Sequence, residues 1–308
     1  MNAPAPDSPA WVHRFAVAAL VVTIALTVGI GGTITSTEVG MAYPTWPDIN
    51  GGSLFSFFYG ELADRYGLGS VVEHTHRQAG SLTGLLVLAT ALGAWLSKRA
   101  DRTLRLLATL ALVLTVGQGL LGADRVLSNS YLGAILHAVG AQVVVVALVA
   151  VVLRSSPAWR EPPAALPADV LGFLRRWTTL GMALLFLNLF AAASVRQKQG
   201  AFAGHLVLAL STAATWFVLT VRMRRLAGPP RLRRRASTLL HLLSAQVLLG
   251  VGAWAVLLGP LGGSGDDRTR FLVQAVVATA HLLVGVLVMA AAAAIWTEVR
   301  HRLRPHAS

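Results

Sequence analysis

The segment YLGAILHAVGAQVVVVALVAVVL, residues 131–153, sets the fold class of this chain. It contains no charged residue, and a helix of about 20 apolar residues crosses the roughly 30 Å hydrocarbon layer of a bilayer. One histidine, His137, lies within it. An imidazole inside a bilayer is costly and usually has a functional role. The segment therefore predicts a transmembrane helix that carries a functional histidine.

The composition of the whole chain agrees with this interpretation. Of 308 residues, 55% are hydrophobic and 13% are charged, and the mean hydropathy is +0.64. Such values are typical of membrane proteins and exclude an ordinary soluble globule. Apolar segments of spanning length lie at 15–35, 73–97, 104–123, 131–153, 171–193, 201–221, 237–258 and 271–296. We expect an all-α integral membrane protein with eight transmembrane helices, the first of them retained because no A-x-A cleavage pattern follows it.

The basic residues predict the orientation in the membrane. Most of the 26 Lys and Arg residues fall on one side of the expected spans, and such residues are retained on the cytoplasmic side. We therefore expect both termini in the cytoplasm, in the cell membrane. The net charge of +13 is then a topology signal and an attraction to anionic lipids. By the same argument, the RLRRR run at 231–235 is an anchor between two spans and predicts no nucleic-acid partner.

The chain also repeats one pattern, in which a histidine is followed by Gln-x-x-x-Gly and then by a second histidine. The pattern comprises His76, Gln118, Gly122 and His137 in the first half, and His205, Gln246, Gly250 and His281 in the second. We assign the longer second interval to the Gly-rich loop 259–270. The repeat predicts two tandem, pseudo-symmetric four-helix bundles, residues 1–154 and 171–308, joined by a Pro-rich cytoplasmic linker at 155–170.

The four histidines lie at equivalent places, near the outer ends of even-numbered helices. A single buried histidine is more often bonded to a backbone carbonyl, but four at equivalent sites of a repeat favour a shared role. Two facing imidazoles are what a six-coordinate haem iron requires. The chain has no cysteine, which excludes disulfides and thiolate ligands and leaves imidazole as the metal ligand.

The densest chemistry lies in VVEHTHRQAG, residues 71–80. Glu73 and His76 are three residues apart and share one helical face, so Glu73 is a candidate catalytic carboxylate. A helix-capping or solvated role for Glu73 stays open. Arg77 could contact a haem propionate or lie at the headgroup level.

At these residues the chain resembles the heme A synthase family. The resemblance rests on GGTITSTEVGMAYPTWPDINGG at 31–52, EHTHR at 73–77, GQGLLGA at 117–123, AILHAVG at 134–140, QKQGAFAGH at 197–205 and ATAHLLVG at 278–285. It implies an oxidoreductase that converts the C8 methyl group of heme O to a formyl group, by successive hydroxylations and loss of water.

The same resemblance implies roles for the site residues. His76 and His137 are the axial ligands of the substrate heme O in the N-terminal half, and Glu73 is the catalytic carboxylate. His205 and His281 are the axial ligands of a resident heme b in the C-terminal half. Heme O synthase is a candidate partner, and the electron acceptor and a homo-oligomer stay open.

Two features depart from the family pattern. Leu206 stands where family members commonly have an arginine after the third histidine, and the cysteine pair that many relatives carry in the first external loop is absent.

Two other functions stay open: a di-haem b-type electron-transfer protein, and a proton-coupled transporter that uses the histidines as proton relays.

Overall fold

A computed structural model describes residues 10–226, 228–257 and 267–306. The loop at 259–270, to which the longer interval of the repeat was assigned, lies largely outside the described residues. Within them, eight helices are long and apolar enough to cross a membrane, which confirms the predicted all-α membrane fold.

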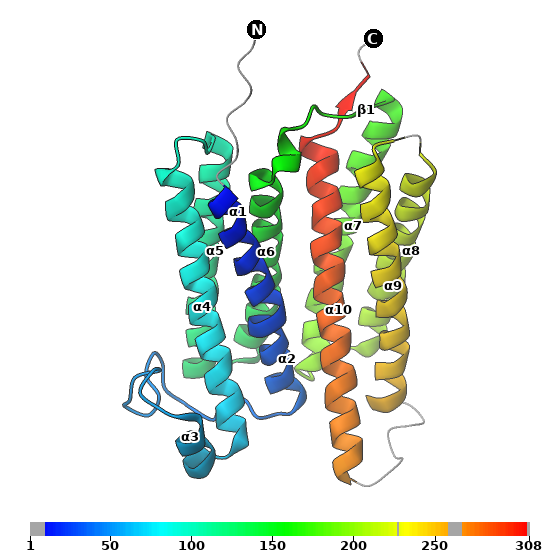
Figure 1. Ribbon diagram of the computed structural model, residues 1–308. Helices are drawn as coiled ribbons and strands as arrows, with labels where there is room; N and C mark the ends of the chain where they lie inside the picture. The colour runs from blue at the N-terminus through cyan, green and yellow to red at the C-terminus, as the bar shows by residue number, and fades with distance from the viewer. Residues whose placement is uncertain (1–9, 227, 258–266, 307–308) are drawn as a thin grey trace.

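The first four spans form the N-terminal bundle (Figure 1). The first span is composed of α1 (Ala10–Val22), a π-helical segment η1 (Thr23–Val28) and α2 (Gly29–Ser36), and the others are α4 (Leu68–Leu96), α5 (Arg102–Ser128) and α6 (Tyr131–Ser155). The second bundle comprises α7 (Ala168–Arg196), α8 (Phe202–Arg225), α9 (Pro230–Leu257) and α10 (Asp267–His301).

The two bundles stand side by side and share a seam. Helix α10 packs against α2 and α6 of the first bundle, and α6 also packs against α7. On this seam a Cβ built on Gly32 would lie 3.2 Å from the Leu282 side chain, and one on Gly29 would lie 3.4 Å from Leu283. The glycines of α2 therefore allow the backbones of the two bundles to approach closely.

The helices extend beyond the expected spans at most ends. Helix α4 begins at Leu68 rather than at 73, and α10 runs over 267–301 rather than 271–296. Hydropathy marks only the apolar part of a helix, whereas backbone hydrogen bonds continue into polar sequence at the membrane edge. Capping explains two of the starts: Asp101 accepts from the Leu104 N–H at 2.8 Å, and Ser130 accepts from the Gly133 N–H at 3.1 Å.

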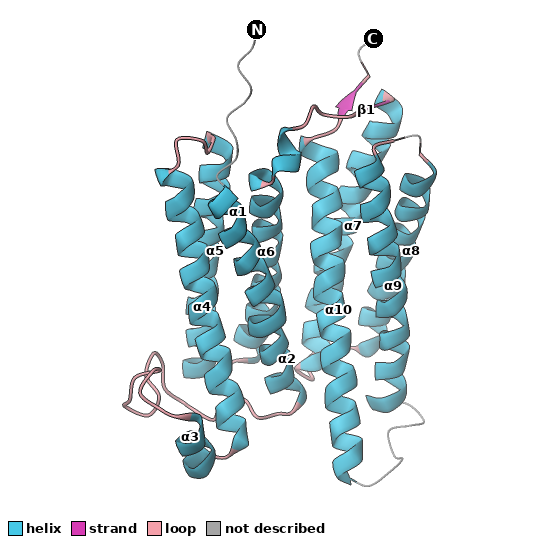
Figure 2. Ribbon diagram, viewed as in Figure 1, coloured by secondary structure: helices cyan, strands magenta, loops and turns pink. Residues whose placement is uncertain are grey.

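Short elements complete the fold (Figure 2). Helix α3 (Tyr59–Tyr66) lies between α2 and α4. The 3-10 turn η2 (Pro157–Arg160) and strand β1 (Ala165–Leu166) follow α6, and β1 pairs in parallel with β2 (Arg304–Pro305). The predicted linker is thus tied to the C-terminal segment, and both chain ends lie at this face of the molecule (Figure 1).

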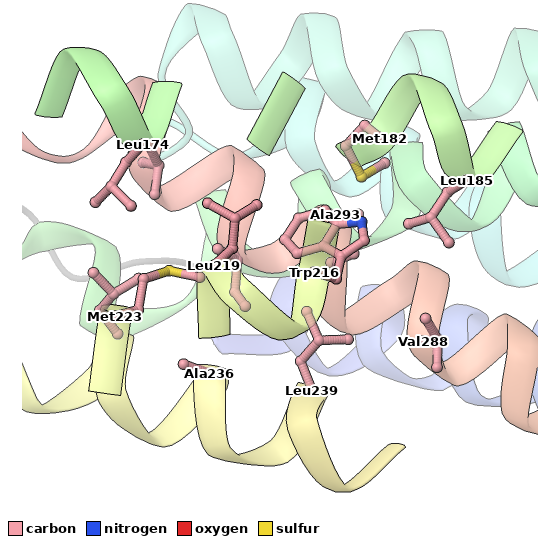
Figure 3. Close-up of a cluster of buried hydrophobic side chains, with 14 of the residues drawn as sticks. Leu174, Met182, Leu185, Trp216, Leu219, Met223, Ala236, Leu239, Val288 and Ala293 are labelled. Carbon is pink, nitrogen blue, oxygen red and sulfur yellow. The ribbon is translucent and has the colours of Figure 1, made fainter. Parts of the chain in front are cut away.

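A large apolar core fills the second bundle and reaches α6. Trp216 is fully buried among Met182, Leu185 and Leu219 (Figure 3). A Cβ on Gly181 would lie 2.7 Å from the Trp216 ring, so the indole packs directly against the α7 backbone. This packing fixes α7 against α8 about three helical turns from His205, which lies near the start of α8.

Candidate functional site

The structure brings the four predicted histidines together in two pairs. His76 of α4 and His137 of α6 are close enough for their charges to interact, and so are His205 of α8 and His281 of α10. Helices α4 and α6 each pack on α1 and α5, so they lie diagonally in the first bundle. Helices α8 and α10 have the same diagonal relationship in the second bundle. Each bundle thus presents two imidazoles to its own interior.

The repeated glutamine makes polar contacts with the second histidine of each pair. The Gln118 amide nitrogen donates to the His137 carbonyl at 2.7 Å and lies 3.1 Å from Nδ1 of the same residue. In the second bundle, the Gln246 amide nitrogen lies 3.3 Å from Nε2 of His281. The sequence showed the repeat but assigned no function to these glutamines. The contacts of these glutamines orient the imidazole rings of His137 and His281.

Glycines lie directly against three of the imidazole rings. A Cβ on Gly122 would lie 3.0 Å from Cε1 of His137, and one on Gly250 would lie 3.2 Å from Cε1 of His281. In the first bundle, a Cβ on Gly31 would lie only 2.8 Å from Cε1 of His76. Side chains at these positions would displace the rings, so glycine is required for the observed ring positions.

Ring nitrogens remain available at three of the four histidines. Nδ1 of His76, His205 and His281 is buried and has no hydrogen-bond partner among the described residues. A buried polar atom without a partner costs roughly 1–3 kcal/mol, so such atoms usually mark a ligand or a water. A neutral ring nitrogen is the atom that binds iron or another transition metal. The donor chemistry of the paired imidazoles therefore fits a haem iron in each bundle.

Glu73 is buried, with only 5% of its surface exposed, at the end of the first bundle where α3 lies. Its carboxylate accepts from the Ala42 backbone N–H at 2.8 Å and from Nη2 of Arg77 at 2.8 Å. The solvated state that the sequence left open for Glu73 is therefore not observed. The predicted catalytic carboxylate is instead a fixed, buried anion one helical turn before His76.

Arg77 joins this carboxylate to the loop that precedes α3. Its guanidinium donates to the backbone carbonyls of Tyr43 at 3.0 Å, Thr45 at 2.9 Å and Asp48 at 3.3 Å. These bonds hold residues 37–58 over the end of the bundle, where Tyr43 is fully buried. Burial raises the pKa of the Tyr43 hydroxyl, which therefore stays protonated and donates to the Ser70 carbonyl at 3.3 Å. The propionate contact suggested for Arg77 stays a prediction, because both of its Nη groups donate hydrogen bonds to protein oxygens in this structure.

Arg125 is a site residue that sequence reasoning missed. It lies in the last turn of α5, is half-buried, and interacts electrostatically with Glu73, His76 and His137. Its guanidinium reaches the loop between α2 and α3, since a Cβ on Gly40 would lie 3.5 Å from Nη2. The side chain forms neither a hydrogen bond nor a close ion pair with any residue that the structure describes. From sequence alone, Arg125 is one of several basic residues at the outer ends of helices, and nothing marks it as different.

Residues 63–204 match the family model COX15-CtaA, which describes a cytochrome oxidase assembly protein. Over these residues the chain is similar to the COX15-CtaA family. The match contains the first histidine pair together with Glu73, Arg77 and Arg125, but not Gly31 or the loop that contacts Glu73 and Arg77. No curated protein matches the chain.

The COX15-CtaA match ends one residue before His205. The second site therefore rests on the internal repeat and on the geometry of its glutamine and histidines. At this site Leu206 is 45% exposed on α8, in the position where the resemblance implied an arginine. Arg196 of α7 interacts electrostatically with His281, and it donates to the Gly32 carbonyl at 2.8 Å and to Ser36 Oγ at 2.5 Å.

Proposed function

We propose that this chain belongs to the COX15-CtaA family and is a heme A synthase of the cell membrane, with both termini in the cytoplasm. It would oxidise the C8 methyl group of heme O to a formyl group. The observation that carries the proposal is the buried Glu73 carboxylate, held one turn from His76, which faces His137 across the bundle. The family match over the same residues supports it.

The proposed reaction inserts oxygen twice at one carbon. The methyl group becomes a hydroxymethyl group and then a geminal diol, which loses water to give the aldehyde. In total the substrate takes up one oxygen atom from water and releases four electrons and four protons. The chain must therefore bind the substrate rigidly, accept protons near the reacting carbon, and pass electrons to an acceptor.

His76 and His137 would hold the substrate haem from its two faces, and the Gln118 contact would fix the His137 ring. Glu73, as an ionised carboxylate paired with Arg77, would stabilise positive charge that develops at the oxidised carbon or take a proton from attacking water. The bonds from Ala42 and Arg77 keep this carboxylate in place before substrate arrives, which reduces the cost of positioning it.

Arg125 would bind a propionate of the substrate. A half-buried guanidinium without a protein partner, next to two candidate axial ligands, needs an anion, and arginine binds carboxylates with two parallel hydrogen bonds. A propionate at this place would also neutralise the charge of Arg125 beside the histidines.

His205 and His281 would hold a resident heme b, which supplies one-electron redox chemistry when bound. The contacts of Gln246 and Gly250 would orient His281 there, as Gln118 and Gly122 orient His137. Heme O synthase would be the partner that supplies substrate.

The proposal is tested by co-expression of the chain with a heme O source in a host that lacks heme A, followed by extraction and chromatography of the haems. The Glu73→Gln variant keeps the size of the side chain and removes its charge. Heme A from the parent and little or none from Glu73→Gln would support the synthase. Bound haem without any heme A would favour a di-haem electron carrier, and absence of haem from the purified protein would favour a transporter.

A further inference from the structure

A pocket lined by arginines lies where α6 and α10 end. In Figure 1 these helix ends lie at the opposite end of the molecule from α3. The volume of the pocket is about 180 Å³, and it is open on one side. Its walls come from the end of α6, the η2 segment and the segment after α10, so both bundles contribute. The lining residues are Arg154, Trp159, Glu161, Pro163, His301, Arg302 and Arg304.

Arg302 is the least satisfied cation in this pocket. Only 10% of its side chain is exposed, yet its guanidinium makes no hydrogen bond with a described residue. Its two ion pairs, at 3.8 Å to Glu161 and 3.9 Å to Glu298, are too long for hydrogen bonds. Its Nε is buried without a partner among the described residues. A buried guanidinium in this state is costly unless an anion binds it.

The nearby carboxylates are already committed to other arginines. Glu298 accepts from Arg235 at 2.6 Å, and Glu161 forms a closer ion pair with Arg231 than with Arg302. The third acid at this end, Asp101, pairs with Arg154. These acids therefore leave the positive charge of the pocket uncompensated.

Two further guanidinium groups line the pocket. Nε of Arg154 is buried without a hydrogen-bond partner in the described part of the chain. Arg304 is exposed at the rim and forms no ion pair with a described residue. Unpaired N–H donors of several arginines around one pocket match the oxygens of a phosphate group, which accepts such forked hydrogen bonds.

We propose that this pocket binds the phosphate group of an anionic phospholipid headgroup. The pocket lies where α6 and α10 end, which is the headgroup level for helices that cross the membrane, and Trp159 beside it is typical of that level. Basic pockets between transmembrane helices on the positively charged side recognise anionic headgroups in this way. A bound lipid would contact α6 and the segment after α10 together, and so would stabilise the association of the two bundles.

The test uses the full chain purified in a neutral detergent. Its thermal unfolding is followed with added phosphatidylglycerol, with phosphatidylcholine, and with inorganic phosphate alone. We expect phosphatidylglycerol to raise the unfolding midpoint in a saturable way, because a ligand that binds only the folded state stabilises it. Phosphatidylcholine, which carries no net charge, should give little or no rise.

Three variants locate the effect. Arg302→Gln should weaken the apparent affinity for phosphatidylglycerol by about tenfold or more, and Arg302→Lys by less, because lysine keeps the charge without the planar fork. If Arg302→Gln does not fold, the exposed Arg304→Gln provides the same test. Arg234→Gln, which removes an exposed charge of α9 at the same face, should bind as the parent does.

Each remaining outcome contradicts the proposal. An equal rise with phosphatidylcholine would show that charge is irrelevant. An equal rise with inorganic phosphate that depends on Arg302 would assign the pocket to a free phosphate and not to a lipid. Loss of the effect in Arg234→Gln as well would show nonspecific attraction to the basic face.

Discussion

Gly31 of α2 lies against the imidazole of His76, so that a Cβ at residue 31 would come within 2.8 Å of Cε1. Real Cβ atoms do not approach a ring this closely, and either α2 or the imidazole would have to move. The first span therefore belongs to the site through Gly31. A π-helical segment interrupts this span just before Gly31. π-helical segments within α-helices are frequent at functional sites.

Gly31→Ala should therefore lower haem occupancy of the first site. The displaced His76 ring would bind iron with poorer geometry, and overpacking of this kind costs about 1–3 kcal/mol, which corresponds to roughly 5- to 150-fold in affinity. Haem content of the purified protein, measured as the pyridine haemochrome, gives the readout. Gly84→Ala in α4 is the control, because a Cβ there meets nothing within 4 Å and occupancy should not change.

Gln118→Leu and Gln246→Leu should each affect only the haem of their own bundle. Each amide contacts one histidine, at 3.1 Å from His137 Nδ1 and 3.3 Å from His281 Nε2. Outer contacts of this kind typically contribute 10- to 100-fold to metal affinity or activity. Redox titration of the two haems in each variant would check this. If each variant shifted the reduction potentials of both haems, the prediction that each glutamine affects only its own site would be contradicted.

Arg125→Gln should abolish the preference of the first site for a haem with free propionates over its dimethyl ester. The parent protein should bind the free acid at least about tenfold more tightly, since the ester cannot pair with a guanidinium. Equilibrium titration of the protein freed of haem measures both ligands without any turnover. Arg65→Gln, which removes an exposed charge paired with Glu61, should retain the preference. Retention of the preference in Arg125→Gln would refute the propionate role while leaving haem binding intact.

Arg77→Gln should release the loop between α2 and α3. Three loop carbonyls and the Glu73 carboxylate depend on this one guanidinium, and the Ala42 N–H donates to the same carboxylate. We expect hydrogen exchange of the Ala42 amide to accelerate by about tenfold or more, which corresponds to the loss of one charge-assisted hydrogen bond. Arg65→Gln again serves as the charge control. Unchanged exchange at Ala42 would show that other contacts hold the loop.

The sequence predicted the elements of this fold well because hydropathy is a local property. All eight spans and the four histidines could be read from apolar segments and from the repeated Gln-x-x-x-Gly pattern. The repeat also identified Gln118 and Gln246 by position, although only the structure shows that they contact the histidine that follows them.

What the sequence could not supply are contacts between distant residues. The pairing of β1 with β2 joins positions about 140 residues apart, and two-residue strands carry no periodicity. The π-helical segment in the first span likewise has no local signal. Arg125 differs from its basic neighbours only through its surroundings, which come from α4, α6 and the loop between α2 and α3.

The most direct test of the central claim is conversion of heme O by the purified protein with a chemical electron acceptor, with the haems extracted and separated over time. We expect heme A to accumulate with the parent protein. We expect Glu73→Gln to bind heme O with similar affinity but to form heme A at least about a hundredfold more slowly. Equal rates in the two proteins would contradict the role of Glu73. Stable binding of heme O without any product from the parent would contradict the proposed synthase.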